Sequence, residues 1–178
     1  MSLMNPKARG VKSIQTQWSC PWFDVIKFKY GKQTHYRIRT SKDGAMAIII
    51  RKDGKFVMVK MRRPSFDKPK LEILGGGIEK NETPEQTIIR EIAEETGYKV
   101  LSIKPLVSVA PLCDKALYNG HCFVARVGNR PEHDPIEKDL PDAKVMVMGL
   151  PQLLRACRQG KVEWVSLSLL LYYLQFKK

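Results

Sequence analysis

The feature that most constrains this chain is a run of three glycines followed by a helix with strong start and stop signals. Gly75-Gly76-Gly77 come shortly before a helix that we predict over Thr83–Thr96. Thr83 stands at the N-cap position, Pro84 is the first helical residue, and Gln86 completes a capping box. Gly97 is the expected C-terminal stop. A glycine loop ahead of a helix lets a phosphate chain approach the backbone closely.

The last turns of this helix carry a self-repelling set of acidic residues. Glu91 and Glu95 are four positions apart, and Glu94 lies three positions after Glu91. Like charges at these spacings destabilise a helix by about 0.2–0.5 kcal/mol per pair, and the dipole at this end favours cations. A solvated acidic face is one interpretation. The other is a site for a hard cation such as Mg²⁺ or Mn²⁺, which prefers oxygen ligands.

The spacing of the whole segment decides between these interpretations. Five residues separate Gly76 from Glu82, and seven separate Glu82 from the run Arg90-Glu91-Ile92-Ala93-Glu94-Glu95-Thr96-Gly97-Tyr98. This arrangement resembles the Nudix box at every fixed position, with Tyr98 where the pattern usually has an aliphatic residue. The resemblance to the MutT-type Nudix hydrolases implies a metal-dependent enzyme that uses water to split a diphosphate linkage.

The resemblance also implies roles for individual residues. The metal, Mg²⁺ or Mn²⁺, would be held by the backbone carbonyl of Gly75 and by Glu91, Glu94 and Glu95. Catalysis would involve Glu94, Glu95 and Arg90, with Arg90 orienting the glutamates through an ion pair. Glu82 would support the loop and the helix, and Gly97 would allow the closing turn.

In many relatives the general base that activates the water is a carboxylate on a later loop. Our choice is Glu137, which precedes a predicted strand over Lys144–Met148. The other candidates in the same region are Glu132, Asp139 and Asp142.

Segments outside the box resemble the ADP-ribose pyrophosphatase branch of the family. These are Phe56 to Arg63, Leu71 to Gly76, and Gly160-Lys161-Val162 with the helix that follows. The resemblance implies substrate contacts from Arg63, Glu72, Gly76 and Gly77. ADP-ribose or a related nucleoside diphosphate sugar is the expected substrate. The segment Pro111–Ala116 lacks the glycine-rich acidic loop of that branch, which leaves nucleoside triphosphates, dinucleoside polyphosphates and capped RNA as alternatives.

The order of predicted elements indicates an α+β protein. We expect a Nudix α/β/α sandwich with a mixed β-sheet, preceded by an N-terminal antiparallel hairpin. Residues 1–20 show no clear period and are interpreted as a flexible lead-in, residues 21–42 as the hairpin, and residues 43–178 as the hydrolase domain. Asp53-Gly54 is a strong hairpin signal within that domain.

Charge and composition bear on partners and compartment. The net charge is +13, and residues 1–80 contain 18 basic and 6 acidic side chains. This half would attract polyanions, so nucleic acid is a candidate partner beside a nucleotide diphosphate substrate. An inactive Nudix module that binds RNA or a nucleotide is the alternative of a different class. The hairpin resembles the extra sheet through which that branch forms dimers, so a homodimer is also expected.

The cysteines and the apolar segments complete the expectations. The 4 cysteines form no CxxC pair, which disfavours zinc and suits a reducing cytoplasm. The apolar stretch Trp164–Phe176 is 13 residues long, too short to span a bilayer, and no membrane association is expected. Trp22, Phe23 and Tyr36 could stack on a base, although core packing is the alternative.

Overall fold

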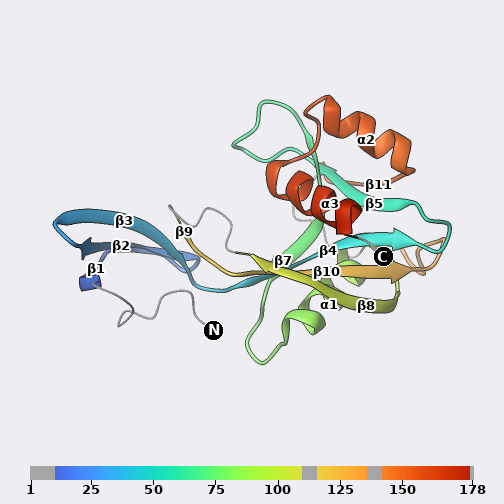
Figure 1. Cartoon of the computed structure of the whole chain (residues 1–178). Helices are drawn as coiled ribbons and strands as arrows, with labels where there is room; N and C mark the ends of the chain where they lie inside the picture. Colours follow the sequence, from blue (N-terminus) through green and yellow to red (C-terminus); the bar gives the residue numbers. More distant parts are fainter. Residues whose placement is uncertain (1–10, 110–115, 136–141, 177–178) are drawn as a thin grey trace.

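We describe the chain from a computed structural model, in which residues 11–109, 116–135 and 142–176 are placed. A mixed sheet forms its centre (Figure 1). The strands are β4 (Gly44–Arg51), β5 (Phe56–Met61), β8 (Val100–Val109), β10 (Gly120–Val127) and β11 (Lys144–Met148). They run in the order β11-β5-β4-β10-β8, and β4 and β10 are parallel while the other neighbours are antiparallel.

Two shorter strands extend the sheet on the side of β4 away from β10. β6 (Lys70–Glu72) pairs with β5, and β7 (Leu74–Gly77) pairs with β4 over Gly44–Ala47. The prediction of a glycine loop is therefore wrong in one respect, because Gly75, Gly76 and Gly77 lie in a strand. Glycine has a low intrinsic propensity for β-strands. The pairing with β4, and not the local sequence, therefore determines this conformation.

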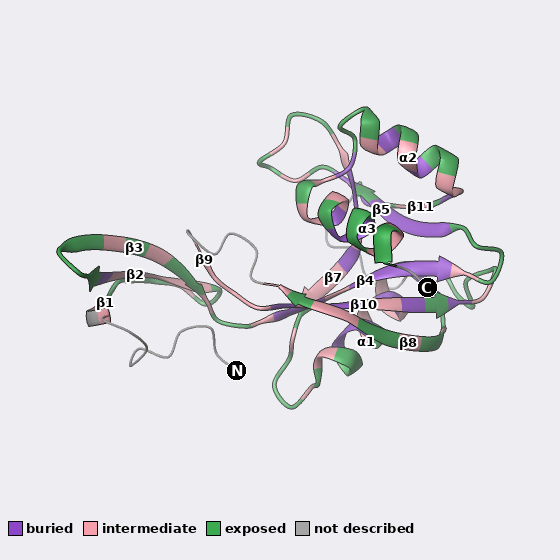
Figure 2. Cartoon of the chain, viewed as in Figure 1, coloured by how far each residue is buried: buried purple, intermediate pink, exposed green. Residues whose placement is uncertain are grey.

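Helices cover both faces of the sheet, and alternate residues of the strands feed two cores. On one face, Ile88 and Ile92 of α1 (Pro84–Thr96) pack in one cluster with Ala45, Ala47 and Ile49 of β4. On the other face, Ile48 and Ile50 pack in a second cluster with buried residues of α2 (Leu150–Arg158) and α3 (Trp164–Phe176). Figure 2 shows the buried strands between the helices. The predicted α/β/α sandwich is confirmed.

Both ends of α1 follow the local signals in the sequence. The Thr83 hydroxyl accepts a hydrogen bond from the Gln86 backbone N–H, and the Gln86 side chain accepts one from the Thr83 N–H. Gly97 ends the helix at a φ of +70°, and a Cβ there would lie 1.9 Å from the carbonyl oxygen of His133. Only glycine meets both conditions without strain.

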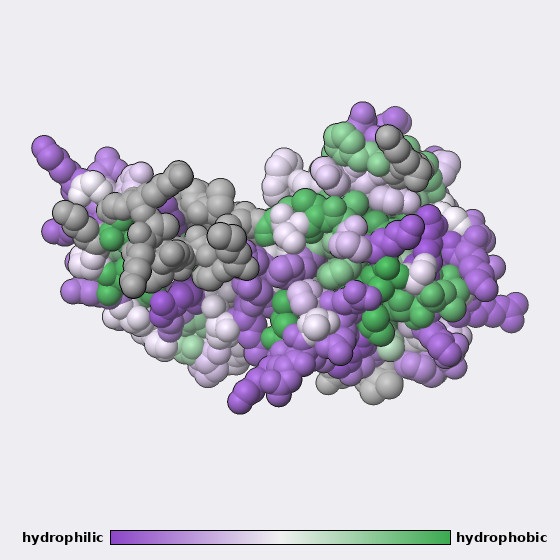
Figure 3. Space-filling view, turned by 60° about the horizontal axis from the view of Figure 1, so that its bottom comes forward, coloured by the Kyte–Doolittle hydropathy of each residue, from purple (hydrophilic) through white to green (hydrophobic). Residues whose placement is uncertain are grey.

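A second, smaller sheet projects from this body (Figure 1). It contains β1 (Val11–Ser19), β2 (Phe23–Tyr30), β3 (Gln33–Thr40) and β9 (Ala116–Leu117), in the order β1-β2-β3-β9. The predicted hairpin is present as β2 and β3. Figure 3 shows hydrophilic side chains projecting from this sheet, where Lys29, Lys32 and Arg39 are exposed.

The prediction of a flexible lead-in is wrong for residues 11–19, since these form β1 and pair with β2. The register shifts twice along this pairing, between Lys12 and Gln15 and between Thr16 and Trp18. Such irregularities break the two-residue alternation by which a strand is recognised in a sequence. Residues 1–10 lie outside the described residues.

The helix expected after Gly160-Lys161-Val162 is confirmed as α3. Within the described ranges, no helix combines the length and the apolar character needed to cross a membrane.

The packing of α1 can be tested with two adjacent isoleucines. Ile88 is fully buried, whereas Ile89 is 38% exposed. We expect Ile88→Ala to lower the free energy of unfolding by about 2–5 kcal/mol, because it leaves a cavity against the sheet. Ile89→Ala should change it by no more than about 0.5 kcal/mol. Urea unfolding of the two variants would measure this difference, and equal losses would contradict the described orientation of α1.

Candidate active site

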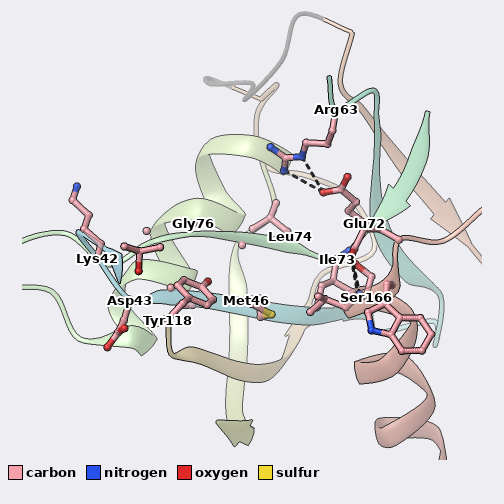
Figure 4. A pocket seen from close by; sticks show the side chains of 18 of the residues that line it. Lys42, Asp43, Met46, Arg63, Glu72, Ile73, Leu74, Gly76, Tyr118 and Ser166 are labelled. Carbon is pink, nitrogen blue, oxygen red and sulfur yellow. Dashed lines mark hydrogen bonds and ion pairs between the residues drawn. The ribbon is translucent and has the colours of Figure 1, made fainter. Parts of the chain in front are cut away.

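A cavity of about 600 Å³ opens beside the glycine strand. Its walls come from β3, β4, β5, β6, β7 and β9, from Glu95 near the end of α1, and from the start of α3. Residues far apart in the sequence therefore meet there: Lys42 and Asp43, Arg63 and Glu72, the three glycines of β7, and Glu163 to Ser166 (Figure 4). Of the predicted site residues, Arg63, Glu72, Gly75, Gly76, Gly77 and Glu95 all line this cavity.

The glycines of β7 allow α1 to pack closely against the strand. A Cβ at Gly76 would lie 2.0 Å from Oε1 of Glu91 and 2.3 Å from its Cδ. A Cβ at Gly75 would lie 2.8 Å from the carbonyl oxygen of Ala45. The Glu91 carboxylate thus lies directly on the backbone of Gly76, at the distance that only glycine permits.

Arg90 connects the acidic side chains around α1. Its Nε and Nη2 donate to the two carboxylate oxygens of Glu82 at 2.9 and 3.2 Å. Its Nη1 donates to Oε1 of Glu91 at 3.0 Å and to Oε2 of Glu94 at 2.9 Å. One guanidinium therefore offsets the repulsion of three carboxylates, which is the orienting ion pair that the sequence resemblance implied for Arg90.

Glu82 is held firmly in its charged form. Its hydrogen bonds from Arg90 and from the Thr87 hydroxyl, the latter at 2.8 Å, lower the pKa of this carboxyl to about 2. The Glu82 hydrogen bond in turn raises the pKa of Arg90 above its usual value. Glu82 remains ionised at all physiological pH values and fixes the guanidinium between the start and the end of α1.

The predicted metal ligands come from two elements that meet at the cavity. Glu95 and Gly75 both line it, and Glu91 lies against Gly76. In the described part of the chain, however, no three His, Cys, Asp or Glu side chains gather closely enough to hold a metal ion. Arg90 contacts Glu91 and Glu94 in this arrangement. The site therefore offers hard oxygen ligands of the type that Mg²⁺ prefers. Two of these carboxylates, Glu91 and Glu94, are paired with the guanidinium of Arg90.

An ion pair lies across the cavity on β6 and the residues after β5. Arg63 donates through Nε and Nη2 to Oε2 of Glu72, at 3.2 and 3.1 Å (Figure 4). The other oxygen, Oε1 of Glu72, is buried and has no hydrogen-bond partner among the described residues. A buried acceptor without a partner is costly, so this oxygen is suited to receive a donor from a bound ligand.

The remaining candidates either lie outside the described residues or are described but do not line this cavity. Glu137 and Asp139 lie outside the described residues, as does the segment Pro111–Lys115. Glu132 and Asp142 are placed but are not among the residues that line the cavity. The aromatic candidates Trp22, Phe23 and Tyr36 belong to the smaller sheet or its edge and do not line it either.

Two aromatic residues that the sequence did not single out do line the cavity. Tyr118 follows β9, and Trp164 is the first residue of α3. One feature of the sequence could have indicated that Trp164 is exposed. It is the first residue of a helix, so no preceding helical turn covers its side chain. Neither residue could be assigned to the site without knowing which elements meet there.

Comparison with known proteins places this geometry in a family. The model of the NUDIX domain family matches residues 40–170. The ADP-ribose pyrophosphatase of Bacillus subtilis is 30% identical over 162 residues, which are 88% of this chain and 85% of that protein. The chain belongs to the Nudix family. The predictions of Nudix membership, of a resemblance to ADP-ribose pyrophosphatases and of a pyrophosphohydrolase are confirmed.

Two further comparisons extend these similarities. The methanol dehydrogenase activator of Bacillus methanolicus is 38% identical over 95 residues, which are 53% of this chain and 51% of that protein. A solved structure of an ADP compounds hydrolase superposes with a TM-score of 0.74 at 15% identity and covers 93% of each chain. The latter similarity shows that the two chains share a fold.

The contact between Glu91 and the glycine strand predicts unequal effects of two adjacent substitutions. Gly76→Ala would place a methyl group on the Glu91 carboxylate, whereas a Cβ at Gly77 meets only Cδ of Lys42 at 3.5 Å. A displacement of about 1 Å can lower catalysis by about 100-fold, so we expect a loss of that order for Gly76→Ala. The fold should persist because the flexible Glu91 side chain can move. Gly77→Ala should retain most activity, and comparable losses in the two variants would contradict this geometry.

Proposed function

We propose that this Nudix protein is a Mg²⁺-dependent ADP-ribose pyrophosphatase, which hydrolyses ADP-ribose to AMP and ribose 5-phosphate. The observation that carries the proposal is a single cavity that joins Glu95 and the glycines of β7 to the Arg63–Glu72 pair. The similarity to the Bacillus subtilis ADP-ribose pyrophosphatase over most of both chains supports this substrate.

The proposed ligands of the ion are Glu91, Glu94, Glu95 and the backbone carbonyl of Gly75. Carboxylate and carbonyl oxygens are the ligands that Mg²⁺ prefers, and Gly75 and Glu95 line the same cavity. When bound, the ion supplies charge neutralisation at the diphosphate and lowers the pKa of a water. Arg90 contacts both Glu91 and Glu94, so its proposed role is to position these two carboxylates.

Other groups of the chain would bind and orient the substrate. The guanidinium of Arg63 places positive charge at the cavity, where it can attract the diphosphate. The unpaired Oε1 of Glu72 can accept a hydrogen bond from a ribose hydroxyl. Gly76 and Gly77 let phosphate oxygens approach the backbone closely.

The reaction forms a bond between the water oxygen and one phosphorus atom and breaks the bond from that phosphorus to the bridging oxygen. A base takes the proton from the water, and Glu137 remains the proposed base.

The scattered single cysteines support a reducing, cytoplasmic compartment for this enzyme.

A substrate panel with two glutamine variants tests the proposal. With Mg²⁺, ADP-ribose should be cleaved to AMP faster than nucleoside triphosphates, dinucleoside polyphosphates or capped RNA. Glu95→Gln should lower kcat by about 100-fold or more, because a charged ligand at the reacting centre is lost. Glu85→Gln removes the same charge from an exposed position on the same helix and should have no effect.

Chelation of the metal with EDTA should abolish the activity, and added Mg²⁺ should restore it. If no diphosphate in the panel is cleaved and Glu95→Gln matches the unaltered protein, the proposal fails. Tight, salt-sensitive RNA binding in that case would instead support the inactive binding module.

We also propose that the protein forms a homodimer through the smaller sheet. Trp18, Val25 and Ile38 are paired across β1, β2 and β3 and therefore share one face. Tyr36 lies two residues from Ile38 on that same face. Trp18, Tyr36 and Ile38 are exposed, and large apolar side chains exposed on one face of a sheet favour association.

Two exposed tyrosines on opposite faces of this sheet provide a matched test. Tyr36 lies on the proposed interface face, whereas Tyr30 lies on the other face of β2. Sedimentation should give about twice the monomer mass of 20.4 kDa. Tyr36→Ser should weaken the dimer by about tenfold or more, as expected for an aromatic interface residue, and Tyr30→Ser should not. A monomer at all concentrations, or equal effects of both variants, would refute the interface.

A further inference from the structure

The first residue of α3 is a tryptophan whose side chain is left in solvent at the catalytic cavity. Trp164 lines the same cavity as Glu95 and the glycines of β7, and it is 73% exposed. An indole buries a large apolar area when it packs against another group. An exposed indole therefore lacks the favourable free energy that this burial would give. Nothing in the packing of α3 requires an indole at this position, because the buried residues of that helix are Ser166, Leu169 and Leu170.

The backbone beneath this indole is fixed relative to the glycine strand. The Glu163 N–H donates to the carbonyl oxygen of Leu71 at 2.9 Å, and the Leu71 N–H donates to that of Lys161 at 2.8 Å. The Ile73 N–H donates to the Ser166 hydroxyl at 3.0 Å. Residues on both sides of Trp164 are therefore hydrogen-bonded to β6 and to Ile73, two residues before Gly75.

The Glu163 carboxylate further stabilises the start of α3. It accepts hydrogen bonds from the backbone N–H groups of Val165 at 2.8 Å and Ser166 at 2.9 Å. These are the N–H groups that a helix start leaves without partners, so Glu163 acts as a cap. An exposed aromatic ring on a capped, anchored helix start is a preorganised surface for a planar ligand.

The other aromatic residue of the cavity is packed against the protein. A Cβ at Gly44 would lie 2.0 Å from the Tyr118 hydroxyl oxygen, so this ring covers the start of β4. In Figure 4, Tyr118 lies with Lys42 and Asp43 at one end of the cavity, and Ser166 lies near Glu72 at the other end. Among the described residues that line the cavity, Trp164 is the exposed aromatic side chain.

We infer that Trp164 stacks on the base of the nucleotide. This contact would make the enzyme prefer substrates that carry a base. The inference rests on the proposed function and adds an orientation to it. The nucleoside end of the substrate lies toward Trp164 and Ser166, and the sugar phosphate beyond the diphosphate lies toward Lys42 and Tyr118. Every base has a π-face, so Trp164 favours nucleotides as a class and discriminates little between adenine and guanine.

The first experiment uses the protein without metal or turnover. Of the 3 tryptophans, Trp18 and Trp22 are replaced by phenylalanine, which leaves Trp164 as the emitting residue. AMP should quench its fluorescence saturably, and GMP should do so at similar concentrations. Ribose 5-phosphate, which has the sugar and the phosphate but no base, should leave the emission unchanged. An emission that AMP does not alter would overturn the inference.

The second experiment measures steady-state hydrolysis of ADP-ribose. Trp164→Ala should raise KM about tenfold with little change in kcat, which corresponds to about 1.4 kcal/mol. Trp164→Phe should restore most of the affinity because a stacking ring is retained. Trp22→Ala is the matched control, since Trp22 is also 73% exposed but does not line the cavity, and it should leave KM unchanged.

An unaltered KM in Trp164→Ala would also overturn the inference. The two proposals fail separately. If AMP quenches Trp164 but the protein cleaves no diphosphate, the stacking site stands and the proposed activity is wrong. If ADP-ribose is cleaved and Trp164→Ala behaves like the unaltered protein, the activity stands and the base is bound elsewhere.

Discussion

The arrangement of the site depends on one guanidinium that binds three carboxylates. Helix α1 has no basic residue in its last turn, and Glu91, Glu94 and Glu95 lie within its last two turns, near the negative end of the helix dipole. Arg90 offsets this repulsion through contacts to Glu91 and Glu94, and its contact to Glu82 fixes the guanidinium from the opposite direction. Helix geometry places Arg90 about 100° around the axis from Glu91, so their contact depends on the reach of both long side chains.

The ion pairs would not position the carboxylates without the glycine strand beside them. Because Gly76 has no Cβ, the Glu91 carboxylate can lie on its backbone and α1 can approach β7 closely. The pairing of β7 with Gly44–Ala47 then ties this contact to the centre of the sheet. The position of the Glu91 carboxylate thus depends both on its ion pair with Arg90 and on the close packing at Gly76.

The parts of this structure that the sequence predicts are those governed by local chemistry. The limits of α1 follow from Thr83, Gln86 and Gly97, whose effects operate within a few residues of one another. β1 was not predicted because its register shifts interrupt the alternation of side chains. Trp164 was missed for a different reason: its place in the site depends on the pairing of Leu71 with Lys161 and Glu163, which are about 90 residues away.

The segment Lys70–Gly77 connects the acidic residues of α1 with the start of α3, where we infer that the base is bound. Its first half, β6, binds the backbone at the start of α3, and its second half, β7, packs against α1. The residues proposed to act at the diphosphate and the residue proposed to stack on the base are therefore positioned by the two ends of one eight-residue stretch. In the proposed function, the acidic set of α1 would restrict the reaction to a metal-bound diphosphate. On the role inferred for Trp164, substitutions of this residue would change which group is carried on that diphosphate without disturbing the glutamates, because Ser166 and Glu163, and not the indole, make the hydrogen bonds at the start of that helix.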